Sequence, residues 1–199
     1  CCPAFVDYVE KNFPDLAQYI SGTPSPMVMI GKRIKMTDPQ ARVVFIGPCV
    51  AKKKEYQMGK TMGTIDCALT FEELYPLFAS RGINVENMEE AALDEASGFG
   101  RSFAHSGGVA AAVAQGLKEH GVDEKQFKLN AVSCSGLNAC KVELLKFAKG
   151  IGGVNFLEGM ACEGGCVQGP GIMVRSPKNQ QEVQKHAKEA GERTILEAV

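Results

Sequence analysis

The stretch ARVVFIGPC, residues 41–49, decides the fold class of this chain. Its apolar run, rich in β-branched residues, predicts a buried strand over 41–46 that ends at Gly47-Pro48. Cys49 then follows the carboxyl end of the strand, which is the edge where ligands bind in open α/β sheets. A cysteine at this position is therefore a candidate ligand or reactive group.

Strands and helices alternate along the rest of the chain. Thr70 and Glu73 have the spacing of a capping box, which predicts the start of a helix. This alternation predicts an α/β fold with mixed or parallel sheets flanked by helices. Further strands are predicted over 65–69, 129–134 and 154–160, a Gly/Ser-rich loop over 94–108, and helices over 4–20 (broken at Pro14), 27–36, 71–81, 109–120, 139–149 and from Pro177 to the C-terminus.

The composition is that of an ordinary globular protein. The 199 residues are 45% hydrophobic with a formal net charge of −1, so no surface for nucleic acid is expected. No apolar stretch reaches the about 20 residues that cross a bilayer, so no membrane span is expected. No signal peptide is visible, and we expect a cytoplasmic protein. The chain begins Cys1-Cys2-Pro3 without an initiator methionine, so we expect an N-terminal part of the same protein to be missing.

The cysteine content is high for a chain of this kind. A secreted disulfide framework and a metal site are the two explanations. A chain of this length does not need disulfides for stability, and the adjacent Cys1-Cys2 are poor partners for each other, so we favour metal. The eight residues are Cys1, Cys2, Cys49, Cys67, Cys134, Cys140, Cys162 and Cys166.

The loop CEGGC, residues 162–166, is the sharpest local feature. Two thiolates four residues apart can turn towards one metal centre, and the glycines let backbone N–H groups approach the sulfur atoms. Cys2 and Cys49, which lie in loops bounded by proline or glycine, bring the number of thiolates to four. Four thiolates are the usual complement of a [4Fe–4S] cluster, and zinc also accepts four, so the spacing leaves both metals open.

Three motifs resemble the active-site signatures of iron-only ([FeFe]) hydrogenases. They are CCP over 1–3, PCVAKKKE over 48–55 and EGMACEGGCVQG over 158–169, in the order found in that family. The segments Ser97–Gly100 and Ser106–Val109 are similar to a further SGxG…GGV pattern of the family. The resemblance implies that residues 1–176 are the C-terminal part of the hydrogenase H-cluster domain, with 177–199 as a helical tail. It further implies two lobes around an iron–sulfur active site.

The resemblance also implies a ligand set. Cys2, Cys49, Cys162 and Cys166 would hold a [4Fe–4S] cubane. Cys166 would also bridge the cubane to a diiron subcluster that carries CO, cyanide and a dithiolate. The cubane and the diiron subcluster together form the H-cluster.

Further residues acquire roles from the same resemblance. Cys1 would pass protons to and from the dithiolate, and Lys52 would donate a hydrogen bond to a cyanide. The residues implied to pack near the diiron site, to line it or to lie in the proton path are Met160, Ser25, Pro26 and Ser21.

The implied activity is the reversible reduction of protons to H2, with electrons from ferredoxin or another low-potential carrier, in an anaerobic bacterium. This chain by itself is expected to be inactive, because half of the family's cluster pocket precedes the first motif. Met27 stands where the family commonly has glutamine, and Gly47 where it has methionine. These two departures motivate one alternative, a hydrogen or redox sensor. A Nar1-like iron–sulfur assembly protein, which shares the fold and the cubane cysteines, is the other.

The remaining candidate residues receive structural interpretations. Cys67 is expected to be inert in its strand. Cys134 and Cys140 are interpreted as packing residues, with an extra redox or metal role as the alternative. The glycines over 97–108 lack the lysine of a phosphate-binding Walker motif. The histidines have no ligand spacing and are interpreted as surface or capping residues: His105, His120 and His186.

Overall fold

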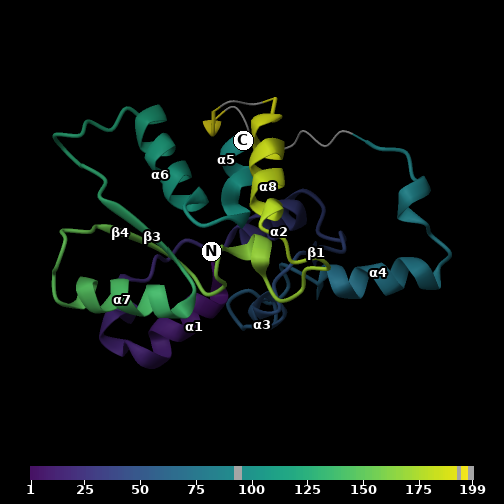
Figure 1. The fold of residues 1–199 in the computed structure, drawn as a ribbon, viewed down its shortest axis with the longest axis horizontal. Coiled ribbons are helices and arrows are strands. Elements are labelled where there is room, and N and C mark those ends of the chain that lie inside the picture. The colour runs from purple at the N-terminus through teal and green to yellow at the C-terminus, as the bar shows by residue number, and fades with distance from the viewer. Residues whose placement is uncertain (92–95, 192–193, 197–199) are drawn as a thin grey trace. The chain divides into compact units, whose positions relative to one another are not determined.

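The computed structural model describes residues 1–91, 96–191 and 194–196, and it divides the chain into two compact units. Unit 1 comprises Cys1–Glu90 with Gly169–Val174, and unit 2 comprises Ala91–Gln168 with Arg175–Val199. Figure 1 shows their helices and strands. Each unit contains a two-stranded parallel sheet with helices packed against it, which confirms the predicted α/β class.

The predicted elements of unit 1 occur in the predicted order, and α3 and η2 are present in addition. Pro14 separates the first helix from a 3₁₀ helix, because proline cannot continue the preceding turn. The capping box is present, since the Thr70 hydroxyl accepts from the Glu73 N–H at 3.3 Å and the Thr70 N–H donates to the Glu73 carboxylate at 2.9 Å. The elements are α1 (Pro3–Asn12), η1 (Pro14–Tyr19), α2 (Pro26–Thr37), β1 (Val44–Ile46), α3 (Ala51–Glu55), β2 (Cys67–Leu69), α4 (Phe71–Ser80) and η2 (Val85–Asn87).

The sheet of unit 1 pairs β1 with β2, and its core lies on one side of it. The core consists of buried residues from α2 and the strand region, namely Met27, Val28, Val43 and Ile65. Val44 and Ile46 point away from this core and are 47% and 43% exposed. The prediction of a fully buried strand is therefore wrong for these two residues. Successive side chains of a strand point to opposite faces, and within unit 1 the core cluster covers only one of them.

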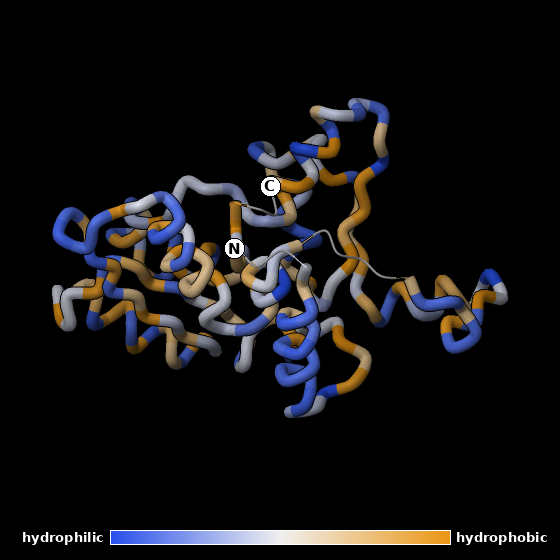
Figure 2. The backbone as a smooth tube through the Cα atoms, turned by 90° about the horizontal axis from the view of Figure 1, so that it is seen from above, coloured by the Kyte–Doolittle hydropathy of each residue, from blue (hydrophilic) through white to orange (hydrophobic). Residues whose placement is uncertain are grey.

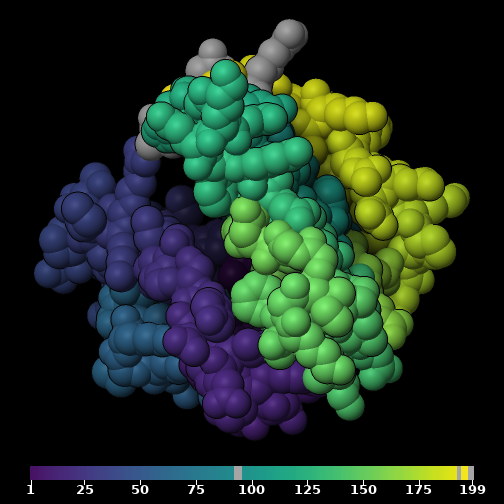
Figure 3. All heavy atoms as spheres, turned by 90° about the vertical axis from the view of Figure 1, so that its left-hand side faces the viewer, coloured from purple at the N-terminus to yellow at the C-terminus, as the bar shows by residue number. Residues whose placement is uncertain are grey.

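Unit 2 contains the second parallel sheet, in which β3 and β4 pair from Ala131↔Phe156 to Ser135↔Met160. Helices α6 and α7 both contact this sheet. The turn over 150–153 that follows α7 lies on the surface (Figure 3). The elements are α5 (Gly98–Arg101), η3 (Ser102–Ala104), α6 (Gly108–Glu119), β3 (Ala131–Ser135), α7 (Leu137–Ala148), β4 (Phe156–Met160), η4 (Cys166–Gln168) and α8 (Lys178–Lys188).

Two predictions in unit 2 need correction. The segment predicted as a loop over 94–108 contains α5 and η3, because the Ser97 hydroxyl accepts from the Gly100 N–H at 3.1 Å and caps a helical turn. Residues 94 and 95 of that segment lie outside the described residues. Helix α8 ends at Lys188 and does not run to the C-terminus. Its polar character is as predicted, and Figure 2 shows α8 coloured hydrophilic along its length.

Helix α8 packs on α5 in unit 2, although few of its side chains are apolar. The Arg101 guanidinium of α5 donates to the His186 carbonyl at 3.1 Å, near the C-terminal end of α8. A cation there satisfies a helix carbonyl and complements the negative end of the helix dipole. Gly98 lies against the Ala187 carbonyl so closely that a Cβ atom would stand 2.7 Å from its oxygen. The glycine of α5 therefore permits the close approach of the two helices.

Asp66 connects three parts of unit 1. Its carboxylate accepts from Lys35 of α2 at 2.8 Å, from Arg42 at 3.3 Å and from the Val43 backbone N–H at 2.7 Å. The Lys35 hydrogen bond and then the Val43 N–H hold the pKa of Asp66 at about 2. This carboxylate therefore fixes the entry of the chain into β1 against α2.

Replacement of Asp66 should destabilise unit 1 in a pH-dependent way. A carboxyl whose pKa is lower in the folded state stabilises the fold above its unfolded pKa, and this contribution is lost as the pH falls towards about 2. We expect Asp66→Asn to lower the thermal midpoint at pH 7, with a difference from the parent that shrinks between about pH 4 and pH 2. Asp15→Asn on η1 is the matched control. Equal shrinkage for both variants would contradict the role of Asp66.

Candidate metal centre

Cys2 lies at the start of α1. It is the N-cap residue, and its Sγ accepts the N–H of Phe5 at 3.4 Å. Pro3 occupies the first helical position, where no N–H is required. A backbone N–H at the sulfur and the positive end of the helix dipole are both suited to a negatively charged partner. Cys2 is therefore in a local setting that suits an anionic metal ligand.

Cys49 follows the carboxyl end of β1, as predicted. The Gly47 N–H donates to the Leu69 carbonyl at 3.0 Å and extends the pairing of β1 with β2. The Pro48 carbonyl then accepts the Gly171 N–H at 2.9 Å. These two bonds fix the backbone on the N-terminal side of Cys49, and α3 begins two residues after it.

Lys52 is buried in α3 and has two partners. Its ammonium donates to the Glu55 carboxylate at 2.6 Å and to the Cys1 carbonyl at 3.2 Å. The sequence interpretation missed Glu55, although the i,i+3 spacing on a helix indicated the pair. Because burial of a lone charge is costly, Glu55 explains how Lys52 can be buried. The next two lysines instead form ion pairs nearer the surface, Lys53 with Glu73 and Lys54 with Asp7.

The second pair of cysteines lies in unit 2, beyond the buried end of β4 at Met160. Gly164 and Gly165 both have positive φ angles, 79° and 88°, which allow the tight turn between Cys162 and Cys166. The Gly164 N–H donates to the Ser135 hydroxyl at 3.1 Å. A Cβ atom on Gly165 would lie 2.8 Å from the Ser106 nitrogen. Glycine is therefore required at 165 for close packing as well as for backbone conformation.

Glu158 is a buried carboxylate that the sequence interpretation did not single out. It accepts from the backbone N–H groups of Gly107 at 3.0 Å and Ala110 at 2.8 Å, and from the Ser133 hydroxyl at 3.3 Å. The carboxylate thus caps α6 from the neighbouring strand β4. This contact joins the motif that begins at Glu158 to the start of α6.

The residues implied to line a diiron site lie around the start of α2. Ser25 is buried and caps the helix, because its hydroxyl accepts the Val28 N–H at 3.4 Å. Pro26 occupies the first helical position. The Ser21 hydroxyl is exposed and accepts the Thr23 N–H at 3.2 Å. Met27 packs in the core of unit 1, so an apolar side chain at this position has a structural reason.

The Phe45 ring occupies the space beside Gly47 where a side chain would otherwise lie. A Cβ atom on Gly47 would lie 2.8 Å from Cζ of Phe45. A methionine at 47, as in the family's signature, would therefore require the Phe45 ring to move. The glycine at 47, where the family has methionine, is therefore linked to the position of the Phe45 ring.

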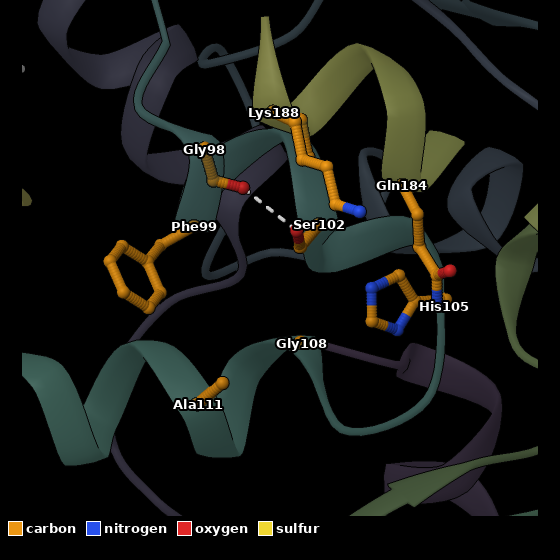
Figure 4. Close-up of a pocket in the computed structure, with 9 residues that line it drawn as sticks. Gly98, Phe99, Ser102, His105, Gly108, Ala111, Gln184 and Lys188 are labelled. Atoms are coloured by element: carbon orange, nitrogen blue, oxygen red, sulfur yellow. Dashed lines mark hydrogen bonds between the residues drawn. The ribbon is translucent and has the colours of Figure 1, made fainter. Parts of the chain in front are cut away.

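Unit 2 also contains a cavity of about 350 Å³ between α5, η3, α6 and α8 (Figure 4). Its described walls are largely apolar, and the Ser102 hydroxyl that faces it donates to the Gly98 carbonyl at 2.7 Å. The His105 ring and the Lys188 ammonium add polar groups to the walls. None of the motif cysteines lines this cavity.

The four predicted ligands are divided between the units. Unit 1 brings Cys1 close to Lys52 and holds Cys2 and Cys49, whereas unit 2 holds Cys162 and Cys166 together with Met160. Within the described ranges, no group of three or more His, Cys, Asp or Glu residues forms a metal site. The shared cubane thus remains a prediction.

The local chemistry of the cysteines fits a thiolate-bound cluster. Each of the eight retains its thiol, so none is consumed in a disulfide. The Cys2 sulfur accepts a backbone N–H. The turn between Cys162 and Cys166 contains two glycines, which place no side chains beside the sulfur atoms. N–H donors near sulfur and small residues around it are typical surroundings of iron–sulfur ligands.

The three motifs lie within a region that matches a known family. The family described as "Iron only hydrogenase large subunit, C-terminal domain" matches residues 1–170. The chain belongs to this family. Iron hydrogenase 1 of Clostridium pasteurianum is 30% identical to it over 223 residues, which cover 92% of the chain and 39% of the relative. The chain spans 39%, 50% and 36% of the length of three curated hydrogenases that it matches, this one included.

Two further comparisons extend this result. A solved [FeFe]-hydrogenase structure, concerned with oxygen inactivation of its H cluster, has the same fold with a TM-score of 0.75 at 23% identity. The match covers 100% of this chain and 67% of that one. The cytosolic Fe-S cluster assembly factor NAR1 of Eremothecium gossypii is 30% identical over 92 residues, 46% of this iron-only hydrogenase domain and 20% of NAR1. Across the described residues, no helix is long and apolar enough to cross a membrane.

Loss of the Glu158 carboxylate should destabilise unit 2. Glu158→Gln keeps the size of the side chain but replaces one acceptor oxygen with an amide that cannot accept an N–H. We expect the free energy of unfolding to fall by ~1–3 kcal/mol, because a buried backbone donor loses its partner. Urea unfolding followed by circular dichroism measures this. Glu124→Gln, at an exposed position, is the matched control and should change stability by less than about 0.5 kcal/mol. Equal stabilities of the two variants would contradict the capping role.

Proposed function

We propose that this chain is the part of an [FeFe] hydrogenase that holds the H-cluster, and that it serves the reversible reduction of protons to H2. The observation that supports this most directly is the local setting of the motif cysteines. Cys2 caps a helix N-terminus, Cys49 follows a strand end, and Cys162 and Cys166 flank a turn of two left-handed glycines. Each setting presents a thiol to a ligand and does not bury it as packing.

The proposed ligands come from both units. Cys2 and Cys49 of unit 1 and Cys162 and Cys166 of unit 2 hold one [4Fe–4S] cubane, and Cys166 also bridges to the diiron subcluster. When bound, the H-cluster supplies the electron relay and the metal at which protons and H2 interconvert. The protein's own residues bind this group, orient it and control the proton supply.

Cys1 and Lys52 act together in this proposal. Cys1, an exposed residue, passes protons through its Sγ, and Lys52 fixes the Cys1 backbone through the 3.2 Å bond to its carbonyl. An ammonium has three donors, and two of those of Lys52 go to Glu55 and Cys1. In this proposal the third donates to an anionic cyanide ligand.

The other predicted residues have supporting roles. Met160 is 1% exposed at the end of β4 and packs beside the diiron subcluster. Ser25 and Pro26 shape the start of α2 as part of the lining, and Ser21 belongs to the proton path. Residues 1–176 form the domain with this function, and 177–199 follow it as a helical tail.

A longer protein completes the site in this proposal. The uncovered apolar side chains of β1, Val44 and Ile46, fit an additional element supplied by an N-terminal part of the same protein. Without that part, we expect no H2 turnover from these 199 residues. Ferredoxin or another low-potential carrier exchanges the electrons, and the protein works in the cytoplasm of an anaerobic bacterium.

Two other functions have specific observations in their favour. A hydrogen or redox sensor with the same cluster is favoured by Met27 in the core and by Gly47 beside the Phe45 ring, because both positions depart from the catalytic signature. An iron–sulfur assembly role is favoured by the match to NAR1. The complete motifs at Cys1-Cys2-Pro3 and over 158–162 favour the hydrogenase over the assembly protein.

Infrared spectroscopy of the matured full-length protein separates these functions. A hydrogenase should show CO and cyanide stretching bands and produce H2 from reduced ferredoxin. A sensor should show the bands with little turnover, which would contradict the catalytic part of the proposal. Absence of the bands, with iron and sulfide present, would contradict both and support the assembly role.

Lys52 offers a sharper test within the same experiment. Lys52→Met keeps the length of the side chain and removes the ammonium, so the cyanide bands should shift or the diiron subcluster should fail to load. Lys53→Met, which removes only an exposed ion pair with Glu73, is the matched control and should leave the bands unchanged. Unchanged bands in fully loaded Lys52→Met would contradict the proposed contact.

A further inference from the structure

Cys134 and Cys140 form a buried pair of thiols in unit 2. Cys134 is 6% exposed in β3, and Cys140 is fully buried in the first turn of α7. Their sulfur atoms are 3.3 Å apart. A disulfide has an S–S bond of about 2.05 Å, so the pair would have to close by roughly 1.3 Å. Only Gly136, with a φ of 83°, separates the strand from the helix, so the two side chains belong to one compact turn.

The two thiols have different chemical character. Cys140 lies near the N-terminus of a helix of 12 residues, where the helix dipole favours a thiolate. The Cys134 S–H donates to the Cys140 sulfur, which lowers the pKa of Cys140 and raises that of Cys134. Burial opposes the ionisation of both. Cys140 is therefore the better nucleophile, and Cys134 is the thiol that retains its proton.

The same turn is bonded to the loop that carries Cys162 and Cys166. The Cys140 thiol donates to the Met160 carbonyl at 3.5 Å, and the Gly136 N–H donates to the same carbonyl at 2.9 Å. The Ser135 hydroxyl, next to Cys134, accepts the Gly164 N–H at 3.1 Å. If the two sulfur atoms change their bonding, the Cys140 donor to the Met160 carbonyl at the end of β4 changes as well. The Ser135 hydroxyl, which accepts the Gly164 N–H and so holds the loop, also changes position.

We propose that Cys134 and Cys140 are a redox modification site, a dithiol that a hydroperoxide converts to a disulfide and whose state is transmitted to the loop over 162–166. The consequence for a bound cluster rests on the proposed function, whereas the dithiol chemistry does not. Packing alone requires neither the contact of two sulfur atoms nor the bond from Cys140 to the Met160 carbonyl, because an alanine or valine would fill the space.

The chemistry balances in two steps. The Cys140 thiolate attacks one oxygen of the hydroperoxide, the O–O bond breaks, and a sulfenic acid forms while the other oxygen leaves as an alcohol or water after protonation. The Cys134 sulfur then attacks the Cys140 sulfur, the S–O bond breaks, and hydroxide leaves with the Cys134 proton as water. Two thiols are oxidised by two electrons, and the hydroperoxide is reduced. Because Cys140 is fully buried, the oxidant must be small, which makes hydrogen peroxide the suitable probe.

Peptide mass spectrometry tests the modification directly. Trypsin releases residues 129–141 as one peptide, which contains Cys134 and Cys140 and no other cysteine. We expect cluster-free protein treated with hydrogen peroxide and then alkylated to give this peptide two hydrogens lighter and unalkylated, and a phosphine to reverse the change. Cys67 is the internal reference. Oxidation of Cys67 at doses that leave both thiols of the pair alkylated would overturn the proposal, as would stepwise oxidation to sulfinic acid without a disulfide.

Hydrogen–deuterium exchange tests the transmission to the loop. On oxidation, the exchange rate of the peptide that contains Gly164 should change several-fold in the parent protein and stay constant in Cys140→Ala. Cys67→Ala is the matched control and should behave as the parent does. A disulfide that forms without any change in exchange would overturn the transmission. Neither readout requires a cluster, so failure here and failure of the proposed hydrogenase function are distinguishable.

Discussion

The buried carboxylate of Glu158 is the interaction on which unit 2 depends most. It joins β4 to the N-terminus of α6 and to Ser133 of β3, and it does so four residues before Cys162. A buried charge is tolerable only when it is fully hydrogen-bonded, so this contact permits one arrangement of these elements. The loop that carries two predicted ligands therefore starts from a fixed point. Asp66 has a comparable role in unit 1, where it fixes the entry into β1.

Local signals predicted most of the fold. The capping box at Thr70, the break at Pro14 and the alternation of strands and helices are properties of neighbouring residues, and the structure confirms them. The errors have non-local causes. The exposure of Val44 depends on what covers the second face of its sheet, and a glycine-rich stretch conceals α5 because its stability comes from packing on α8. No short window of sequence contains that information.

The residues of the candidate site also divide into those that the sequence predicted and those that depend on non-local contacts. The motif cysteines were predicted from their spacing and loop settings and from the resemblance to a family, and Lys52 from the resemblance alone. The local settings of the cysteines fit the predicted chemistry. Glu55 and Glu158 were missed as partners, because a carboxylate that neutralises a lysine or caps a distant helix has no marker of its own in the sequence. The meaning of Gly47 also depended on structure, since only the position of the Phe45 ring shows why a larger residue would not fit.

In the proposed function, cysteines from two separate units bind one cluster. The direct measurement is electron paramagnetic resonance of the dithionite-reduced protein after anaerobic reconstitution with iron and sulfide, together with iron analysis. The account predicts about four iron ions per chain and a reduced [4Fe–4S] signal that is lost in both Cys49→Ala and Cys166→Ala but kept in Cys67→Ala. A full signal in either Cys49→Ala or Cys166→Ala would contradict it.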